Sequence, residues 1–304
     1  MARAKPAKAG TPTKAGTRSA RSYIITMVES LCIVGVGLLG GSIALAARSL
    51  GLVKRIVGIS RQQETLDIAI KRGMLDEGYL DITEALNAVD LAIICTPVDR
   101  IGGIALDLLK RFPNLVVSDV GSTKQSILDA VNQQPELAKR FVGGHPLAGS
   151  EKSGPEHAMA DLFQDRLMFI TPSDTSSPSS VEVVTQFWQA LGSTTVAVDA
   201  SEHDATMAMT SHLPHIASFA LAGAMSYDYL QYSGTGLRSM CRLAGGDAAM
   251  WTAIALHNRM HLLAGIAEMQ ASLQSFTEAL QTGDAAKLHT LFEKGRRIHH
   301  ALGS

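Results

Sequence analysis

Cysteine is scarce in this chain. The 304 residues include three cysteines, Cys32, Cys95 and Cys241, which are odd in number and far apart. A small protein held together by disulfides would carry more, so this class is excluded and a reducing compartment is favoured. Cys32 and Cys95 lie in apolar runs typical of buried strands, where cysteine acts as a small apolar side chain.

The chain also lacks an excess of charge of either sign. It has 27 basic and 28 acidic residues, a formal net charge of −1. Because residues 1–26 hold six of the basic residues and no acidic one, the remainder is acidic overall. An acidic body repels phosphate backbones, and no basic stripe with interleaved aromatic residues follows. Nucleic acid is therefore not an expected partner.

Residues 1–26 lack apolar periodicity and are rich in Ala, Lys, Thr and Gly. This composition cannot offset the entropy of ordering the chain, which predicts a disordered basic tail. The tail also has the acid-free, Arg- and Ser-containing composition of an organellar transit peptide, but no apolar segment of a secretory signal. We expect a cytoplasmic protein, or a plastid protein if the tail is a transit peptide.

No membrane span is expected. Residues 31–47 are uncharged and approach the length of a span, but they contain four glycines, and Arg48 follows directly. This pattern predicts a buried strand, a turn and a helix.

Short Val- and Ile-rich runs alternate with helical segments in the first half of the chain. This alternation predicts an α/β fold, with an N-terminal Rossmann-like doubly wound sheet covered on both faces. The strands are expected at residues 31–34, 56–59, 91–94, 115–117, 141–142, 167–171 and 194–198, with helices that include 64–72, 101–111 and 181–191.

After residue 200 the strand signals end. Helices are expected over residues 204–231, 247–280 and 284–301, and the Ser/Pro-rich segment 172–180 is a candidate boundary. We therefore expect three parts, namely the tail 1–26, a Rossmann domain 27–172 and a mostly helical substrate and dimerisation domain 173–304. The apolar stripe over 250–280 is long for one domain, which favours a homodimer through this all-helical part.

A glycine loop follows the first expected strand. Gly35, Gly37 and Gly40 match G-x-G-x-x-G at the start of a helix, with Leu38 and Leu39 between them. Gly35 permits a tight turn, Gly37 lets a pyrophosphate approach the backbone, and Gly40 allows close contact between helix and strand. In this context the motif predicts a dinucleotide site.

The residues after the second strand bear on the choice of dinucleotide. An NAD site would hold Asp or Glu there for the ribose 2′-hydroxyl, whereas this chain has Ser60, Arg61 and Gln62. Without a carboxylate, the Ser60 hydroxyl and the Arg61 guanidinium can bind a 2′-phosphate, which favours NADP. The alternative is that Arg61 is a solvated loop charge.

The reacting groups are expected where strands end at the cofactor crevice. Cys95, Thr96 and Pro97 follow the third strand and would line the nicotinamide side. His145 follows the fifth strand among glycines, and its pKa near neutrality suits proton transfer. Taken alone, this histidine is as easily structural.

Six segments, in order from about residue 29 to the C-terminus, carry a resemblance to a known family. They are GVGLLGGS, CTPV, DVGSTK, GGHPLAGSEKSG, SHLPH and CRLAGGDAAMW. This combination resembles the TyrA family, the prephenate and arogenate dehydrogenases of tyrosine biosynthesis. The stretch GISRQQETLDIAIKRGMLDE further resembles the NADP-dependent arogenate dehydrogenases of cyanobacterial type.

The resemblance implies an oxidative decarboxylation. Hydride leaves the ring carbon that bears the 4-hydroxyl for the nicotinamide, and loss of the ring carboxylate as CO2 restores aromaticity. His145 is similar to the family's catalytic histidine, which hydrogen-bonds the substrate hydroxyl and takes its proton. Ser122 matches the serine that orients this histidine and the substrate.

The resemblance also implies partners for the substrate's anionic ends. Arg242 matches a position whose guanidinium binds a carboxylate, and His215 resembles the residue that recognises the pyruvyl or alanyl side chain. His212 lies three residues earlier. Glu151 and Trp251 match supporting positions near the pocket entrance and in the neighbouring helical region.

Three further features qualify the resemblance. Arg238 stands where the family often has Lys or Arg, but Ser239 follows where Asp is common. H-x-x-H at residues 212–215, and His257 with His261, have the spacing of partial metal sites. No third ligand is apparent and hydride transfer to NADP needs none, so no metal is expected, and His257 and His261 should line the helical core or an interface.

The sequence does not decide whether the substrate is arogenate or prephenate. The two substrates differ in whether their side chain is an amino acid or a keto acid, and Asp204 could face an ammonium or cap the following helix. The cyanobacterial-type resemblance favours arogenate, with prephenate dehydrogenase or a dual-specificity cyclohexadienyl dehydrogenase as alternatives. No separate regulatory segment is expected, so feedback inhibition by tyrosine would act at the active site.

Two other functions fit parts of the pattern. A β-hydroxyacid or 6-phosphogluconate type dehydrogenase relies on a catalytic lysine in its helical domain, and here only Lys287 and Lys294 follow residue 200, both in the last helix. A nonenzymatic NADP-sensing module would not need the expected catalytic and substrate-binding residues together. Both are disfavoured.

Overall fold

The computed structural model describes residues 28–149 and 152–303. Among these residues the chain forms two compact units. The first extends to Asp204 and also includes Gly245–His257, and the second comprises Ala205–Ala244 and the residues from Asn258 onward. The expected tail, residues 1–26, lies outside the described residues.

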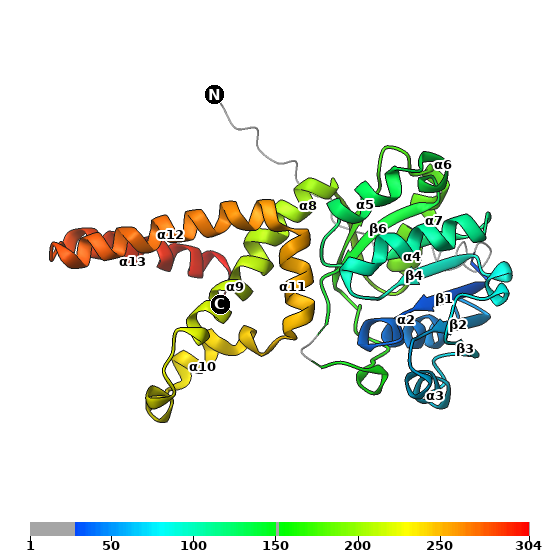
Figure 1. Cartoon of the computed structure of the whole chain (residues 1–304), viewed down its shortest axis with the longest axis horizontal. Coiled ribbons are helices and arrows are strands. Elements are labelled where there is room, and N and C mark those ends of the chain that lie inside the picture. Colours follow the sequence, from blue (N-terminus) through cyan, green and yellow to red (C-terminus); the bar gives the residue numbers. More distant parts are fainter. Residues whose placement is uncertain (1–27, 150–151, 304) are drawn as a thin grey trace. The chain divides into compact units, whose positions relative to one another are not determined.

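The first unit is built on one sheet (Figure 1). Its described strands follow the order β3-β2-β1-β4-β5-β6-β7-β8. Neighbours are parallel except β6 and β7, which are antiparallel. The first six strands have the order of doubly wound nucleotide-binding sheets, which confirms the predicted Rossmann-like fold. The strands are β1 Ser30–Val34, β2 Arg55–Ile59, β3 Glu77–Tyr79, β4 Leu91–Ile94, β5 Val116–Asp119, β6 Phe141–Pro146, β7 Leu167–Thr171 and β8 Thr194–Ala197.

Both faces of the sheet are covered, which explains why its central strands are continuously apolar. Successive side chains of β1 point to opposite faces: Leu31 and Ile33 belong to one core cluster, Cys32 and Val34 to the other. The first cluster includes side chains of three helices, α2 Leu38–Ser49, α3 Gln63–Lys71 and α7 Pro178–Ala190. The second is covered by α4 Val98–Arg111, α5 Gln125–Asn132, α6 Pro135–Ala138 and α11 Ala248–His257.

Two strands differ from the prediction. β3 was not expected, because the sequence Glu-Gly-Tyr at this sheet edge has no apolar run. β6 is longer than the expected residues 141–142 and continues to Pro146, where His145 lies opposite Phe169 of β7. His145 therefore lies within a strand and not after it.

The sheet extends past the expected boundary at residue 172. The Ser/Pro-rich segment is a loop that joins β7 to α7, and the Ser177 hydroxyl accepts a hydrogen bond from the amide of Ser180 at the start of that helix. The hydroxyl of Ser176 also donates to the carbonyl of Phe141 in β6, at 2.8 Å. The division between the units comes after Asp204 instead.

The second unit is helical. It contains α9 Leu213–Gly223, α10 Thr235–Cys241, α12 Arg259–Gln281 and α13 Ala285–Ala301, with a π turn Ala208–His212 and a 3-10 turn Tyr227–Tyr232. A second 3-10 turn, Arg242–Gly245, ends at the first residue of the segment that returns to the first unit. The helix α8, Ala200–Met207, spans the division between the units. None of the described helices is both long and apolar enough to cross a membrane.

Two long predicted helices are broken. The expected helix 204–231 is interrupted by the π turn, after which Pro214 opens α9, and α9 ends at Gly223. The expected helix 247–280 is divided at Asn258, whose φ of −113° and ψ of 26° are not helical. The prediction of one continuous helix of about 30 residues, which would contact a partner subunit, is therefore wrong. The longer of the two helices, α12, has 23 residues.

Candidate active site

The glycine loop has the geometry that a dinucleotide needs. Gly35 has a φ of +97°, and a Cβ there would lie 2.8 Å from the carbonyl oxygen of Cys95. A Cβ on Gly40 would collide with the carbonyl of Gly35. A Cβ on Gly37 would meet no atom within 4 Å, so the space above this residue is open. Gly37 also precedes α2 without a side-chain cap, so the first amides of that helix can receive an anion.

A cavity of about 360 Å³ adjoins this loop. Its wall includes the loop, the ends of β2 and β4 and the segment 80–82. The cavity brings together most of the predicted cofactor residues, namely Gly35, Gly37, Ser60, Arg61, Cys95, Thr96 and Pro97. Leu38, Leu39 and Gln62 are not among the described residues that line it, and Gly40 supports the loop from beneath.

The end of β2 carries hydroxyl and guanidinium groups where an NAD site would carry a carboxylate. Ser60 and Arg61 both line the cavity, and Arg61 is exposed. Thr65, in the first turn of α3, lines the same part and was missed by sequence reasoning. Its signal was its spacing, four residues after Arg61 on the helix that starts at Gln63.

His145 is hydrogen-bonded to a second histidine that the sequence did not single out. Its Nδ1 lies 2.9 Å from Nε2 of His203, and the two rings meet edge to face. Nδ1 of His203 lies 2.8 Å from Oδ1 of Asp204. His203 and Asp204 are buried, whereas His145 is half-buried. A carboxylate and two imidazoles thus form a continuous chain of hydrogen bonds.

Asp204 caps a helix other than the one considered from the sequence. Its carboxylate accepts hydrogen bonds from the backbone amides of Lys124, at 2.8 Å, and Gln125, at 3.0 Å. It therefore caps the N-terminus of α5 and not of its own helix α8, and its burial, at 1% exposure, disfavours contact with a substrate ammonium.

A buried ion pair holds the ends of β5 and β6 together. The ammonium of Lys124 contacts the carboxylate of Asp119 and donates to the carbonyl of Gly144 at 2.8 Å. Asp119 in turn accepts from the amides of Gly144 and Gly121. Burial lowers the pKa of Lys124, and the Asp119 carboxylate opposes that shift. Ser122 lies half-buried between these anchored residues.

In the second unit, His215 and Arg242 interact electrostatically. Nδ1 of His215 donates to the carbonyl of Ser211 at 2.9 Å, which leaves Nε2 as the acceptor nitrogen in the neutral ring. Burial lowers the pKa of His215, the bond to Ser211 opposes this, and the charge of Arg242 lowers the pKa further. Arg242 is exposed at the start of a 3-10 turn.

The remaining predicted histidines take part in internal hydrogen bonds. His212 is buried, and its Nδ1 lies 3.0 Å from the amide nitrogen of Asn258, whose oxygen lies 3.0 Å from Nδ1 of His261. In the first unit, Nδ1 of His257 lies 2.7 Å from the hydroxyl of Ser126. Within residues 28–149 and 152–303, no three His, Cys, Asp or Glu side chains gather as a metal site requires.

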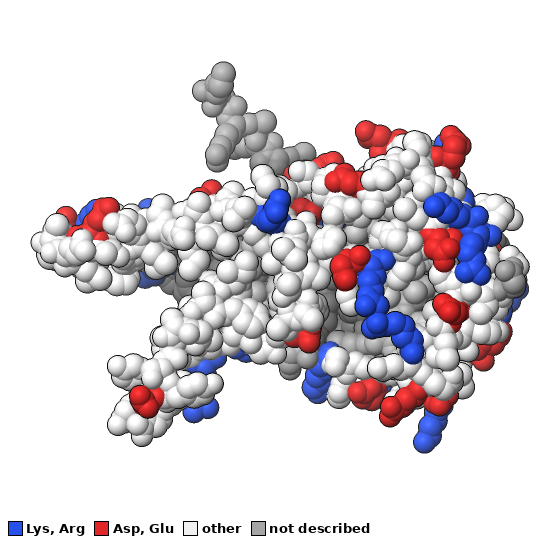
Figure 2. Space-filling view, viewed as in Figure 1, with Lys and Arg blue, Asp and Glu red and all other residues white. Residues whose placement is uncertain are grey.

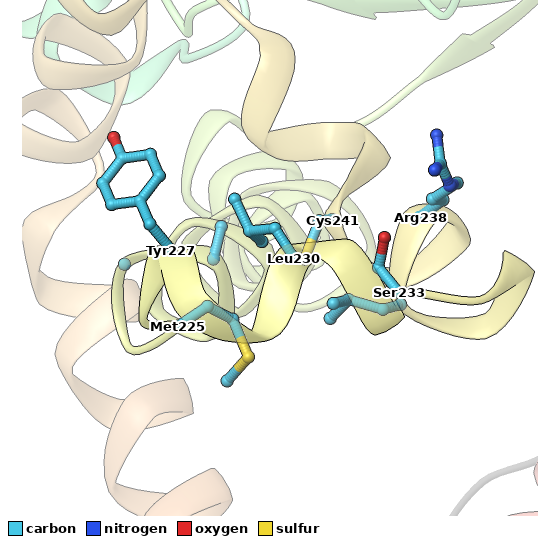
Figure 3. Close-up of a pocket in the computed structure, with 9 residues that line it drawn as sticks. Met225, Tyr227, Leu230, Ser233, Arg238 and Cys241 are labelled. Carbon is cyan, nitrogen blue, oxygen red and sulfur yellow. The ribbon is translucent and has the colours of Figure 1, made fainter.

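Arg238 lies on a different feature of the second unit. It lines a hollow of about 610 Å³ whose other lining is mostly apolar, and Figure 3 shows it at one end, beside Ser233. Of the other expected residues, Trp251 is half-buried on α11 and packs against the core under α4, whereas Glu151 lies outside the described residues.

Two family models together match most of the chain. Residues 43–197 match "Prephenate dehydrogenase, nucleotide-binding domain", and residues 199–294 match "Prephenate dehydrogenase, dimerization domain". The chain is 30% identical to a prephenate dehydrogenase of Bacillus subtilis over 288 residues, which cover 91% of this chain and 76% of that protein. It is 28% identical to a cyclohexadienyl dehydrogenase of Zymomonas mobilis over 289 residues, which cover 91% and 97%.

Solved structures agree with this match. The prephenate dehydrogenase of Aquifex aeolicus, crystallised with hydroxyphenyl propionate and NAD+, has a TM-score of 0.82 and 29% identity, covering 89% of this chain and 98% of that one. The arogenate dehydrogenase of Synechocystis has a TM-score of 0.74 and 28% identity, covering 89% and 99%. The chain therefore belongs to the prephenate dehydrogenase, or TyrA, family of oxidoreductases that use a nicotinamide dinucleotide.

Proposed function

We propose that the protein catalyses the NADP-dependent oxidative decarboxylation of L-arogenate to L-tyrosine. When bound, the nicotinamide would supply the hydride acceptor for this reaction. The observation that carries the proposal is that one unit holds both a dinucleotide cavity and His145, at the edge of the sheet where its parallel strands end. Oxidation of a carbon that bears a hydroxyl requires an acceptor for the hydride and a base for the hydroxyl proton.

Each expected residue has a role in this reaction. His145 accepts the proton of the substrate's 4-hydroxyl, and Ser122 orients His145 and the substrate. Arg242 binds a substrate carboxylate, and His215 recognises the side chain that distinguishes arogenate from prephenate. The further substrate-binding residues, with supporting roles, are His212, Glu151, Arg238 and Trp251.

The choice of NADP is supported by the end of β2. Ser60, Arg61 and Thr65 line the cavity where the ribose 2′ position of a dinucleotide would lie, and the first of these stands where an NAD site carries a carboxylate. A guanidinium and two hydroxyls suit a phosphate dianion, because each can donate to its oxygens.

The choice of arogenate is supported by the likeness to the Synechocystis arogenate dehydrogenase. The likeness to prephenate and cyclohexadienyl dehydrogenases supports prephenate, or both substrates, as the second candidate. With Asp204 bound to α5, recognition of the ammonium falls to groups near His215.

We also propose a homodimer through the helical unit. The matched model of this region is named a dimerization domain. Large apolar side chains are exposed there, including Tyr227 at 89%, Tyr232 at 79% and Phe292 at 66%. The helical unit is also largely uncharged on the face that Figure 2 shows. Such surfaces mark protein interfaces. Light scattering should give twice the chain mass of 32.3 kDa, and a monomer at micromolar concentration would contradict the proposal.

The test of the reaction is steady-state formation of reduced nucleotide with arogenate and prephenate, each crossed with NADP and NAD. The proposal requires the highest kcat/KM with arogenate and NADP. A preference for prephenate overturns the substrate, and activity with NAD alone overturns the cofactor. Inactivity with all four pairs overturns the enzymatic function.

A further inference from the structure

We infer that His203 is a positioning residue that sets which nitrogen of His145 carries a proton, by linking His145 to the carboxylate of Asp204. This role rests on the proposed function, in which His145 is the base. It is assigned from the chain of hydrogen bonds Asp204, His203, His145, and each bond has a direction that the next one must follow.

The direction starts at Asp204. An ionised carboxylate only accepts hydrogen bonds. Asp204 accepts from two backbone amides, those of Lys124 and Gln125, which cannot reverse their polarity. Nδ1 of His203, at 2.8 Å from the same carboxylate, must therefore carry a proton and donate it to that bond.

The direction then passes through the His203 ring. The charged and aromatic groups that face it are Asp204 of its own helix, Lys124 and Asp119 at the ends of α5 and β5, and Phe169 of β7, with ring centroids 5.3 Å apart. Burial is the largest influence and lowers the pKa of His203, as does Lys124, while the two carboxylates oppose the shift. The ring is therefore neutral near neutral pH, with its single proton on Nδ1 and a lone pair on Nε2.

The last bond fixes His145. Because Nε2 of His203 accepts, Nδ1 of His145, 2.9 Å away, must donate. A neutral His145 then has its proton on Nδ1 and a lone pair on Nε2, which is the nitrogen that can take a proton from a substrate hydroxyl. When His145 becomes an imidazolium, Nε2 of His203 still accepts from its Nδ1–H and so stabilises the positive ring. The carboxylate of Asp204, bonded to the other nitrogen of His203, supports this interaction.

A buried histidine could also serve packing alone, so the test must read the proton itself. Two-bond 1H–15N correlation spectra of protein labelled in its ten histidines distinguish the two neutral tautomers of an imidazole. His145→Asn identifies the His145 signals by their loss. The wild-type spectrum is expected to show His145 protonated on Nδ1. A proton on Nε2 would overturn the inference without any variant having to fold.

Two variants of His203 separate its acceptor from its packing. Gln has an amide oxygen that can reach the position of Nε2 and accept from His145, whereas Phe fills the space without an acceptor. In His203→Phe the proton of neutral His145 is no longer held on Nδ1, so we expect a mixture of the two tautomers. We expect kcat to fall about 10-fold to 100-fold at an unchanged KM. His203→Gln should keep the tautomer and recover most of the loss. His289→Gln, at an exposed site on α13, controls for the removal of a histidine signal.

The pH profile gives a second readout. An acceptor on Nδ1–H favours the protonated form of His145, so its loss should move the acid limb of kcat to lower pH in His203→Phe and not in His203→Gln. Equal profiles and equal kcat in the two variants would overturn the inference. The spectra need no substrate, so they test the role of His203 even if neither arogenate nor prephenate is turned over.

Discussion

Lys124 and Asp119 form an ion pair in which both side chains are completely buried. Removal of one partner of such a pair leaves the other charge without compensation in the core, at a cost of about 3–5 kcal/mol. We expect Lys124→Met to lower the free energy of unfolding by this amount, measured by urea denaturation. Lys54→Met removes an exposed ion pair with Glu29 and should cost less than about 1 kcal/mol. Equal losses in the two variants would show that the buried pair is dispensable.

Stability should fall as the pH decreases below the ordinary histidine pKa of 6.5. Because burial lowers the pKa of folded His203, the unfolded chain binds more protons than the folded one between the folded pKa and 6.5. Stability is therefore present above pH 6.5 and is lost as the pH falls through this window. We expect a lower Tm at about pH 5.5 than at about pH 7.5, and a smaller difference in His203→Gln. A variant with the wild-type dependence would assign the effect to other groups.

Two glycines of the cofactor loop should respond differently to alanine. A Cβ on Gly40 collides with backbone, whereas one on Gly37 meets open space. Gly40→Ala should therefore lower the Tm, while Gly37→Ala should leave the Tm unchanged and weaken nucleotide binding, because its methyl group occupies the approach of the pyrophosphate. Titration of NADP followed by protein fluorescence measures the second effect. Unchanged binding by Gly37→Ala would mean that the pyrophosphate does not approach this residue.

Arg61→Ala should discriminate between the two dinucleotides. A hydrogen bond to a charged group contributes about 1.5–3 kcal/mol, so kcat/KM for NADP should fall about 10-fold to 100-fold. The value for NAD should change little, since NAD lacks the 2′-phosphate. Lys71→Ala, which removes an exposed cation at the other end of α3, serves as the matched control. Equal losses with NADP and NAD would assign Arg61 a role unrelated to the phosphate.

Ser122→Ala should reduce kcat less than His145→Asn. The histidine transfers the proton itself, which contributes about 100-fold to 10,000-fold to the rate, whereas the serine only orients the histidine and the substrate. The two kcat values at saturating substrate decide the point. If Ser122→Ala were the more damaging change, Ser122 would have to take part in the chemistry directly.

Local patterns singled out residues that the structure brings to one cavity. The glycine loop and the Ser-Arg pair after β2 directly follow apolar strands in the sequence, so a short motif and its position after a strand were enough to select them. The pairing of His145 with His203 was not predictable in this way, because 58 residues separate them and the contact depends on how α8 meets β6. Asp204 was misread for the same reason, since its partners at the start of α5 lie 79 and 80 residues away.

The errors in the fold have a similar origin. β6 continues through Gly143, Gly144 and His145, which carry no apolar signal, because the ladder with β7 satisfies their backbone. The break at Asn258 interrupts a stretch of uniform helical composition. It is explained by the side chain of Asn258, which is buried between His212 and His261. Contacts of this kind depend on distant residues and leave no periodicity to read.

The order of the units along the chain has a consequence for biosynthesis. The first unit is not finished at Asp204, because α11, with Ile254 in its core, follows a forty-residue segment of the second unit. During synthesis, residue 257 must therefore leave the ribosome before α11 can pack on α4 and cover its apolar face. Fragments that end near residue 204 should expose that apolar face and aggregate, so the cofactor-binding half should not be separable from the helical half by a single cut.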